Sequence, residues 1–557
     1  MQRESDTQGI DMATSSGRAK VAAYTSPTLV FLAMDWSAGI RHADFLGFAI
    51  QRSPGYSKSG VAQFLFNKID FKPIKLGDRP KPSDAAPIQK FNWWDGGINS
   101  ADRGREFTYT VFPVLGHGPD DLRLQDEAAA SIKVTIPHEV VDGIGTYFNR
   151  AVVSSQSFTG MVNKGQSLEK QMAWLANGIE TAVPAFLNTT GQFACAIYHL
   201  TDKQWIAPAL QKFKGEATIV YFFKAPSATA KTPGGDTTNE PARALLERAQ
   251  LEFTPRSHIK SLMHDKFIVA YQNGKSAAVL TGSMNFTPEA QAIQANVLHT
   301  FASPKMAALY AERYALLLSD PSTAKTAAGA AWLPVGDVKG SKIRLIFSPE
   351  PAGQRLAIDA IVDAVSRAKS SVMFCMFSPT DAALLKALLD AGDQGKIMYG
   401  LLNSITDPKT GKQTADGAAP GKSQQILVEV YNRSRRDKKA IAYDFFGKDN
   451  APRGFLPEFS TIDLGGMSLA PHGKGVAAVH IHHKFIIIDA NASTPVVYTG
   501  SANMSKNSVE YNDENLLEIR GNSLLARTYL AEFMRLYNHY RARALWDLSH
   551  PRGGKAQ

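Results

Sequence analysis

The sequence predicts an α/β protein made of two duplicated lobes, each a mixed sheet flanked by helices, preceded by a β-sandwich-like domain. Strand-like and helix-like segments alternate from about residue 141 onward, and this alternation favours sheets with helices outside them. A His-x-Lys pattern followed by Gly-Ser-x-Asn occurs twice with the same spacing, which indicates a duplication. Short apolar runs divided by turn formers fill residues 28–140, as is typical of an antiparallel sandwich.

Composition places limits on these domains. A chain of 557 residues is too long for one hydrophobic core, and its 44% hydrophobic and 20% charged residues are ordinary for a globular protein. The formal net charge of +10 favours an anionic partner, either a nucleic acid or an anionic membrane surface, although such an excess also serves solubility. Cys195 and Cys375 lie in apolar runs, so we expect buried free thiols.

We expect four segments in order: a flexible N-terminus (1–27), a β-rich accessory domain (28–140) and two lobes (141–338 and 339–545). The first segment is polar and lacks the apolar core of a signal peptide. No run approaches the roughly eighteen apolar residues of a membrane span, so no transmembrane segment is expected. A cytoplasmic location is the default prediction, and export by a route without a cleavable signal is the alternative.

The accessory domain is expected to contain the strands 29–36, 44–52, 107–114 and 131–137. Its aromatic cluster of Phe91, Trp93 and Trp94 is interpreted as packing against the sandwich rather than as a ligand platform. We find no catalytic set in this domain.

The first lobe is expected to contain helices at 167–183 and 202–213 and strands at 193–200 and 217–223. The second lobe repeats this order with strands at 342–347, 371–377 and 396–402 and helices at 353–368 and 380–392. Asp202 and Asp381 begin equivalent helices. We expect each sheet to be largely parallel.

The repeated motif carries the polar groups that are suited to chemistry. His482 and Lys484 lie two residues apart in a strand-like run, so both side chains point to one face, and Asp489 closes the run. His264 and Lys266 form the first copy, and the offset from the motif histidine to the following Gly-Ser is 18 residues in both copies.

These residues resemble the phospholipase D superfamily, whose two HxKxxxxD and GSxN motifs meet about a pseudo-twofold axis. The second copy, HHKFIIID, is a full match, whereas Tyr271 stands where the first copy would carry Asp. The resemblance spans residues 140–545 and implies a phosphodiester hydrolase or transferase that works through a phosphohistidine. It implies His264 as the nucleophile, His482 as the general acid, and Asp489 and Glu514 as further members of the catalytic set.

The chemistry fits these residue types. A phosphodiester repels nucleophiles by its negative charge and has a poor leaving group. Lys266 and Lys484 supply positive charge, and the phosphoryl oxygens are expected to bind four hydrogen-bonding residues of the two Gly-Ser-x-Asn motifs, Ser283, Asn285, Ser501 and Asn503. One imidazole then attacks phosphorus while the other donates a proton.

The two copies differ in their carboxylates. Glu514 matches a family carboxylate that orients a histidine, and alignment of Asn296 with Asn515 puts Ala295 at the position of Glu514. The first lobe is therefore expected to have lost carboxylates at Tyr271 and at Ala295. Either one carboxylate serves across the interface, or the site is asymmetric.

His480, His482 and His483 also suggest a metal site, but no second cluster completes four ligands, so neither a metal nor a cofactor is expected.

The leading hypothesis is hydrolysis or transfer of a phospholipid head group, with peripheral contact to an anionic membrane and a monomer that holds both half-sites. A nuclease is the second hypothesis, favoured by net charge and by the basic run 433–439, which lies in a long insertion (404–479) expected near the mouth of the site. A phosphate-binding module without catalysis is the third.

Overall fold

The computed structural model describes residues 17–67, 69–72, 80–152, 161, 164–226, 235–377, 379–402, 445–446 and 481–549. The basic run 433–439, nearly all of the insertion 404–479, and His480 lie outside the described residues. The chain divides into two compact units. One contains the chain up to His138 together with Arg527–Arg535, and the other contains Glu139–Ala526 and the chain from Leu536.

The first unit contains two antiparallel sheets that share a core. A three-stranded sheet has the order β1-β2-β7, with bounds Lys20–Ser26, Leu29–Asp35 and Asn92–Asp95. A five-stranded sheet has the order β10-β8-β3-β4, with β9 beside β8, and its bounds are Ala130–Thr135, Glu106–Leu115, Phe45–Ser53, Gln63–Phe64 and Arg123–Leu124. Buried residues of β2, β3 and β8 form one hydrophobic cluster, so the predicted β-rich domain is confirmed.

Two details of this unit differ from the prediction. Residues 20–26 form β1, so the prediction of a flexible segment is wrong for these residues. Residues 1–16 lie outside the described residues. The unit also recruits part of α13 (Ser523–Ser549), whose Glu532 accepts a hydrogen bond of 2.7 Å from Ser26 Oγ. Trp93 packs against the shared core, whereas Phe91 is 57% exposed.

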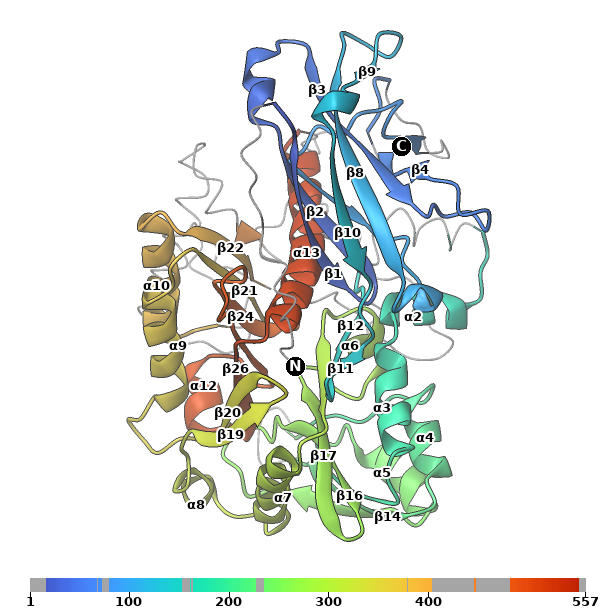
Figure 1. The fold of residues 1–557 in the computed structure, drawn as a ribbon. Helices are drawn as coiled ribbons and strands as arrows, with labels where there is room; N and C mark the ends of the chain where they lie inside the picture. The colour runs from blue at the N-terminus through green and yellow to red at the C-terminus, as the bar shows by residue number, and fades with distance from the viewer. Residues whose placement is uncertain are drawn as a thin grey trace, which may run out of the picture. The chain divides into compact units, whose positions relative to one another are not determined.

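The second unit contains two eight-stranded sheets with matching strand orders (Figure 1). The first sheet has the order β11-β12-β18-β17-β16-β13-β14-β15, with bounds Val140–Val141, Ile144–Phe148, Val297–Phe301, Lys275–Gly282, Lys266–Gln272, Gln192–Ile197, Glu216–Phe222 and Glu252–Arg256. The second has the order β19-β20-β26-β25-β24-β21-β22-β23, with bounds Leu333–Val338, Ser341–Ser348, Glu514–Arg520, Val496–Gly500, Lys484–Ile488, Ser371–Met376, Ile397–Leu402 and Phe445–Phe446. The predicted duplication is therefore present strand by strand.

Strand direction corrects one expectation. Among the described strands of the two lobes, parallel pairing is confined to β13-β14-β15 and β21-β22-β23. The remaining pairs are antiparallel, so the sheets are mixed but not largely parallel. Helices link β13 to β14, β14 to β15 and β21 to β22, whereas the two motif strands of each lobe follow one another as a hairpin.

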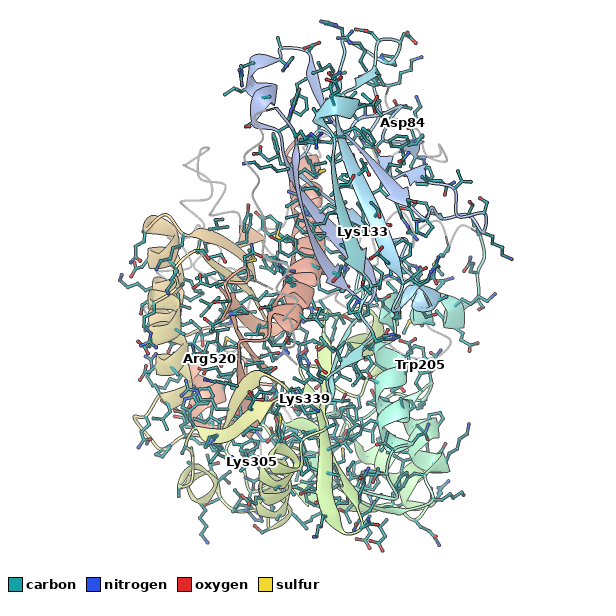
Figure 2. All side chains as sticks on the ribbon, in the orientation of Figure 1. Asp84, Lys133, Trp205, Lys305, Lys339 and Arg520 are labelled. Carbon is teal, nitrogen blue, oxygen red and sulfur yellow. The ribbon has the colours of Figure 1, made fainter. Side chains whose placement is uncertain are left out.

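Helices cover the sheets as the alternating pattern predicts. In the first lobe, α3 (Ile179–Leu187), α4 (Ile206–Lys212) and α5 (Glu240–Glu247) pack on one face through a shared apolar cluster. Trp205, labelled in Figure 2, lies at the start of α4 and packs against this cluster. The predicted helix 167–183 is divided into α2 (Leu168–Ala176) and α3, because Asn177 and Gly178 adopt positive φ angles.

In the second lobe, α9 (Leu356–Ser366) and α10 (Ala382–Asp393) occupy the equivalent face. Asp381 caps α10 by accepting from Leu384 N, and Asp202 accepts from Ile206 N at the start of α4, so the predicted equivalence of these helix starts is confirmed. Both cysteines are buried and free. No helix within the described part of the chain has the length and hydropathy needed to cross a membrane.

The boundary between the lobes lies earlier than expected. β19 pairs with β20 and so belongs to the second sheet, although it ends at Val338. The preceding helix, α8 (Thr323–Ala327), follows α7 (Pro304–Leu318) of the first lobe. The second lobe therefore begins at about Leu333 rather than after residue 338.

Asp489 directly follows β24, at the end of the strand opposite to Lys484, and its carboxylate holds a neighbouring loop. Its carboxylate accepts hydrogen bonds from the main-chain N–H groups of Lys369, Ser370 and Ser371 at 2.7 to 3.1 Å. In the first lobe, Thr190 Oγ1 instead donates to the main-chain oxygen of Tyr271 at 2.6 Å. The Asp-to-Tyr difference between the lobes therefore changes how a loop is fastened to its strand.

We predict that Asp489→Ala lowers the free energy of unfolding by about 1–3 kcal/mol, because it removes the acceptor of several main-chain N–H groups. Burial opposes ionisation, but the hydrogen bonds from Lys369, Ser370 and Ser371 together outweigh it and lower the pKa of Asp489. This contribution is present above the ordinary Asp pKa of about 4 and is lost as pH falls through the lower folded pKa. Urea unfolding at pH 7 and pH 3 measures it, with Asp390→Ala as control, since Asp390 is partly exposed and forms a surface ion pair with Lys386. Equal stability of Asp489→Ala and wild type at pH 7 would contradict the fastening role.

Candidate active site

The two motif histidines meet where the lobes touch. His264 lies two residues before the first residue of β16, and His482 lies two residues before the first residue of β24. The ring centroids of the two histidines are 6.5 Å apart. Each is docked by its main chain onto the opposite lobe, since His264 N donates to Asp513 O (2.8 Å) and His482 N donates to Ala295 O (3.1 Å). Both side chains are nearly buried, at 4% and 6% exposed. The predicted composite of two half-sites is thus present as geometry.

Glu514 of the second lobe contacts His264 of the first. Its Oε1 lies 3.0 Å from His264 Nδ1, and the carboxylate is fully buried. Asn503 N (3.0 Å), Asn512 Nδ2 (2.9 Å) and Ser508 Oγ also donate to this carboxylate. These donors fix the carboxylate, which in turn holds the Nδ1 side of His264 and leaves Nε2 for a substrate.

Asn296 of the first lobe plays the corresponding part for His482. Its Oδ1 lies 2.8 Å from His482 Nδ1, while its Nδ2 donates to Ala290 O (2.9 Å) and Gln294 O (3.1 Å). Those two carbonyls fix the amide orientation, so Oδ1 faces the imidazole and His482 Nδ1 carries a proton.

The hydrogen-bond register corrects the sequence alignment of the two copies. Val297 N donates to Ser283 Oγ (3.1 Å), and Asn515 N donates to Ser501 Oγ (2.9 Å), so Val297 is equivalent to Asn515. Asn296 is then equivalent to Glu514, and Ala295 is equivalent to Asp513. The first lobe therefore lacks the orienting carboxylate as expected, but the expected position is wrong, because the equivalent of Glu514 is the amide Asn296 and not Ala295.

The two motif lysines have equivalent surroundings. Lys266 Nζ donates to His264 O (2.5 Å), and Lys484 Nζ donates to His482 O (2.7 Å). Each ammonium also lies 5.1 Å from an aromatic ring centroid, that of Tyr198 for Lys266 and that of Phe377 for Lys484. The same two rings lie edge-to-face against His264 and His482, at 5.0 Å. One aromatic residue at the end of an inner strand therefore packs beside each His-Lys pair.

Burial sets the charge of this site. It lowers the pKa of Lys266 to about 7, and together with the charge of Lys266 it lowers the pKa of Lys484 well below its usual value. Burial and Lys266 also lower the pKa of His264 to about 4, against the opposing effect of Glu514. Burial disfavours ionisation of Glu514, but the contact with His264 and the hydrogen bonds from Ser508 and Asn512 together outweigh it and lower the Glu514 pKa. At neutral pH, His264 is thus neutral beside an ionised Glu514.

The Gly-Ser-x-Asn residues divide into two kinds. Ser283 and Ser501 are fully buried, and their hydroxyls accept from the main chain, so their observed contacts shape the loop. The side-chain oxygens of Asn285 and Asn503 are buried without a hydrogen-bond partner among the described residues. These two amides therefore keep hydrogen-bonding capacity for a ligand.

Asp489 does not join this group, because its carboxylate is engaged by residues 369–371 at the opposite end of β24 from Lys484. Its assignment to the catalytic set is corrected to a structural one. Within the described ranges, no group of three or more His, Cys, Asp or Glu is arranged to hold a metal ion.

Sequence reasoning missed Tyr198 and Phe377, and it aligned Asn296 with Asn515 instead of with Glu514. The spacing from the motif serine offers a signal for Asn296, since it lies 13 residues after Ser283, as Glu514 lies 13 residues after Ser501. The aromatic residues carry a weaker signal, because aromatics at strand ends are more often core residues.

An oxyanion in this site should take up protons, because negative charge raises the lowered lysine pKa values. We expect sulfate, which does not titrate near neutrality, to bind more weakly as pH rises above 7, by up to about tenfold per pH unit for one coupled proton. Calorimetry in buffers of different ionisation enthalpy measures the uptake. Lys266→Met should reduce it and the exposed Lys275→Met should not. Binding that is independent of pH in the wild type would contradict the charge state described above.

Comparison with known proteins supports the motif assignment. Residues 457–537 match a family model described as "Cardiolipin synthase, PLD-like domain". No curated protein sequence matches the chain. Similar solved structures include phosphatidylserine synthase of Haemophilus influenzae Rd KW20, which is 11% identical over 65% of this chain and 85% of that chain, with a TM-score of 0.40. Nuc from Salmonella typhimurium is 19% identical over 36% and 95%, with a TM-score of 0.22.

A third structure, polyphosphate kinase from Porphyromonas gingivalis, is 10% identical over 61% of this chain, with a TM-score of 0.34. The alignment spans only 42% of that kinase, less than half of its length. The family-model match includes the second His-x-Lys and Gly-Ser-x-Asn motifs, at residues 482–484 and 500–503. The resemblance to the phospholipase D superfamily predicted from the two motifs is thereby confirmed.

Proposed function

We propose that the protein is a phosphodiesterase of the phospholipase D type that hydrolyses or transfers a phospholipid head group through a phosphohistidine. One observation carries this proposal: two imidazoles from different lobes face each other at 6.5 Å, and each is held through Nδ1 by the opposite lobe. That arrangement leaves both Nε2 atoms available on either side of a phosphorus atom.

In the first step, Nε2 of His264 attacks phosphorus and the bond from phosphorus to the leaving oxygen breaks. His482 gives its Nε2 proton to that oxygen. Lys266, Lys484 and the Nδ2 groups of Asn285 and Asn503 donate to the phosphoryl oxygens and stabilise their negative charge. The negative charge of the bound diester favours the protonated form of His482, so His482 carries the proton that it donates once substrate is bound.

In the second step, His482 takes a proton from water or an alcohol, and the oxygen of that acceptor attacks phosphorus. The bond to His264 Nε2 breaks, which regenerates both histidines. Water as acceptor gives hydrolysis and an alcohol gives transfer.

The Glu–Asn asymmetry supports these roles. Attack turns neutral His264 into a phosphorylated imidazolium, whose new positive charge is balanced by the carboxylate of Glu514 at 3.0 Å. His482 loses positive charge in the same step. The amide of Asn296 fixes the tautomer of His482 and, being neutral, does not oppose the loss of this charge. A carboxylate in its place would oppose that loss.

The name of the matched family model, a cardiolipin synthase domain, favours a lipid phosphodiester as substrate. The net charge of +10 favours a second candidate, a nuclease, because it would attract a nucleic acid backbone. A binding module is the third possibility, and turnover of any phosphodiester excludes it. The charge chemistry is carried by lysine, histidine and amide groups, so we expect turnover to persist in chelator.

We predict release of head group from phosphatidylglycerol or phosphatidylcholine vesicles with chelator present, and little cleavage of single-stranded or duplex DNA. His264→Asn and His482→Asn should each lower the rate by about 10²-fold or more, as expected for loss of an acid, base or nucleophile. His258→Asn, at an exposed histidine, should not change it. Nucleic acid cleavage without lipid turnover would instead establish the nuclease. An unimpaired His264→Asn enzyme would show that the first lobe takes no part.

A further inference from the structure

A group of buried charges lies behind His264, where the two lobes are joined. Asp265, Arg256 and Arg313 come from the first lobe and Asp513 from the second, and all four side chains are at most 4% exposed. Asp265 immediately follows His264 in the chain, and Asp513 immediately precedes Glu514. The group therefore adjoins both members of the His264–Glu514 pair without touching a substrate.

Arg313, on α7, bridges the two aspartates. Its Nε donates to Asp265 Oδ2 and its Nη2 donates to Asp513 Oδ1, both at 3.1 Å. The same Nη2 also donates to Ser348 O of the second lobe at 2.6 Å. A single planar guanidinium thus fixes the distance between the residue after His264 and the residue before Glu514.

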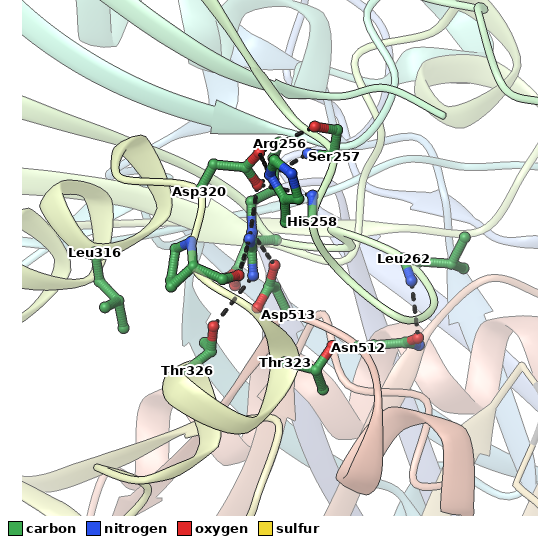
Figure 3. Close-up of polar contacts among 12 residues, drawn as sticks. Arg256, Ser257, His258, Leu262, Leu316, Asp320, Thr323, Thr326, Asn512 and Asp513 are labelled. Carbon is green, nitrogen blue, oxygen red and sulfur yellow. Dashed lines mark hydrogen bonds and ion pairs between the residues drawn. The ribbon is translucent and has the colours of Figure 1, made fainter. Parts of the chain in front are cut away.

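Other contacts hold the two ends of this bridge. Arg256 Nε donates to the second oxygen of Asp513 (2.9 Å) and its Nη1 to Asp320 (2.8 Å), as Figure 3 shows. Figure 3 also shows Leu262 N bonded to Asn512 Oδ1, and Asn512 donates to Glu514. Asn515 Nδ2 donates to the remaining oxygen of Asp265 (2.8 Å). Each residue from Asn512 to Asn515 therefore contacts the first lobe.

The positions beside His482 that are equivalent to Asp265 and Asp513 do not carry aspartates. His483 stands where the first lobe has Asp265, and Ala295 stands where the second has Asp513. No aspartate–arginine–aspartate bridge can form between those two residues. The ionic clamp is therefore specific to the histidine whose partner is a carboxylate, and not a general means of joining the lobes.

We propose that Arg313 is a positioning residue, which holds Glu514 against His264 by bridging Asp265 and Asp513. Its role rests on the proposed function, in which Glu514 balances the charge that His264 gains during attack. Loss of Arg313 removes one positively charged partner from each of the buried carboxylates of Asp265 and Asp513. Burial already raises the pKa of Asp513 to about 6 against the opposing effect of Arg313 and Arg256, so Asp513 would protonate and the 512–515 segment would shift.

A double-mutant cycle tests this role with a nitrophenyl phosphodiester as substrate. Arg313→Met should lower kcat by about tenfold or more with little change in KM. In a Glu514→Gln background, where the charge to be positioned is gone, the same change should cost less than about threefold. Additive losses would overturn the proposal, because they would show that Arg313 acts independently of Glu514.

Arg313→Lys covers the case in which Arg313→Met does not fold, because a compact ammonium keeps the charge but cannot span both carboxylates. It should show the same dependence on Glu514 with a smaller loss. Arg344→Met is the matched control, since it breaks a bidentate pair with Glu518 elsewhere in the second lobe and should leave kcat unchanged.

A readout without turnover separates this proposal from the proposed function. In protein labelled with ¹⁵N-histidine, the Nδ1 proton of His264 should give a downfield signal that Glu514→Gln and Arg313→Met both weaken and Arg344→Met retains. Loss of the signal in an enzyme that cleaves no phosphodiester would keep the positioning role and refute the function. A signal unchanged in Arg313→Met would refute the positioning role alone.

Discussion

The contact between His264 Nδ1 and Glu514 Oε1, at 3.0 Å, is the interaction on which the rest of the site depends. The histidine and the carboxylate belong to different lobes, so the pair exists only if both sheets form and dock in register. The main-chain bond from His264 N to Asp513 O and the bridge through Arg313 fix that register from behind. The duplication supplies two such pairings, and the exchange of Glu for Asn in one of them makes the two histidines chemically different.

This arrangement has an energetic cost. Lys266 and Lys484 are buried, and burial lowers the pKa of both despite the opposing charge of Glu514, which also contacts His264. Poorly compensated buried charges destabilise a fold, and replacement by apolar groups often stabilises it. Their retention is understandable if a bound anion completes the charge balance, as in the reaction we propose.

Much of this fold was predictable because the two lobes repeat both their element order and the 18-residue motif offset. The accessory domain followed from alternating runs such as 107–114. Strand direction was not predictable, since apolar runs in β13 and β16 look alike whether they pair in parallel or antiparallel. The recruitment of α13 by the first unit depends on Ser26 and Glu532, which are 506 residues apart and share no local pattern. In the site, the four motif residues His264, Lys266, His482 and Lys484 were identified from the repeat of both residue type and spacing. Asn296 was misaligned by one position, because only the Ser283–Val297 hydrogen bond fixes the register.

The central claim is that His264, held by Glu514, forms the bond to phosphorus, and trapping of the covalent adduct tests it most directly. A nitrophenyl phosphodiester has a leaving group that needs little protonation, so His482→Asn should accumulate a phosphoryl adduct and His264→Asn should form none. Mass spectrometry of peptides after a quench without acid locates the modified residue. The account predicts the adduct on His264, and an adduct on His482 in the His264→Asn protein would contradict it.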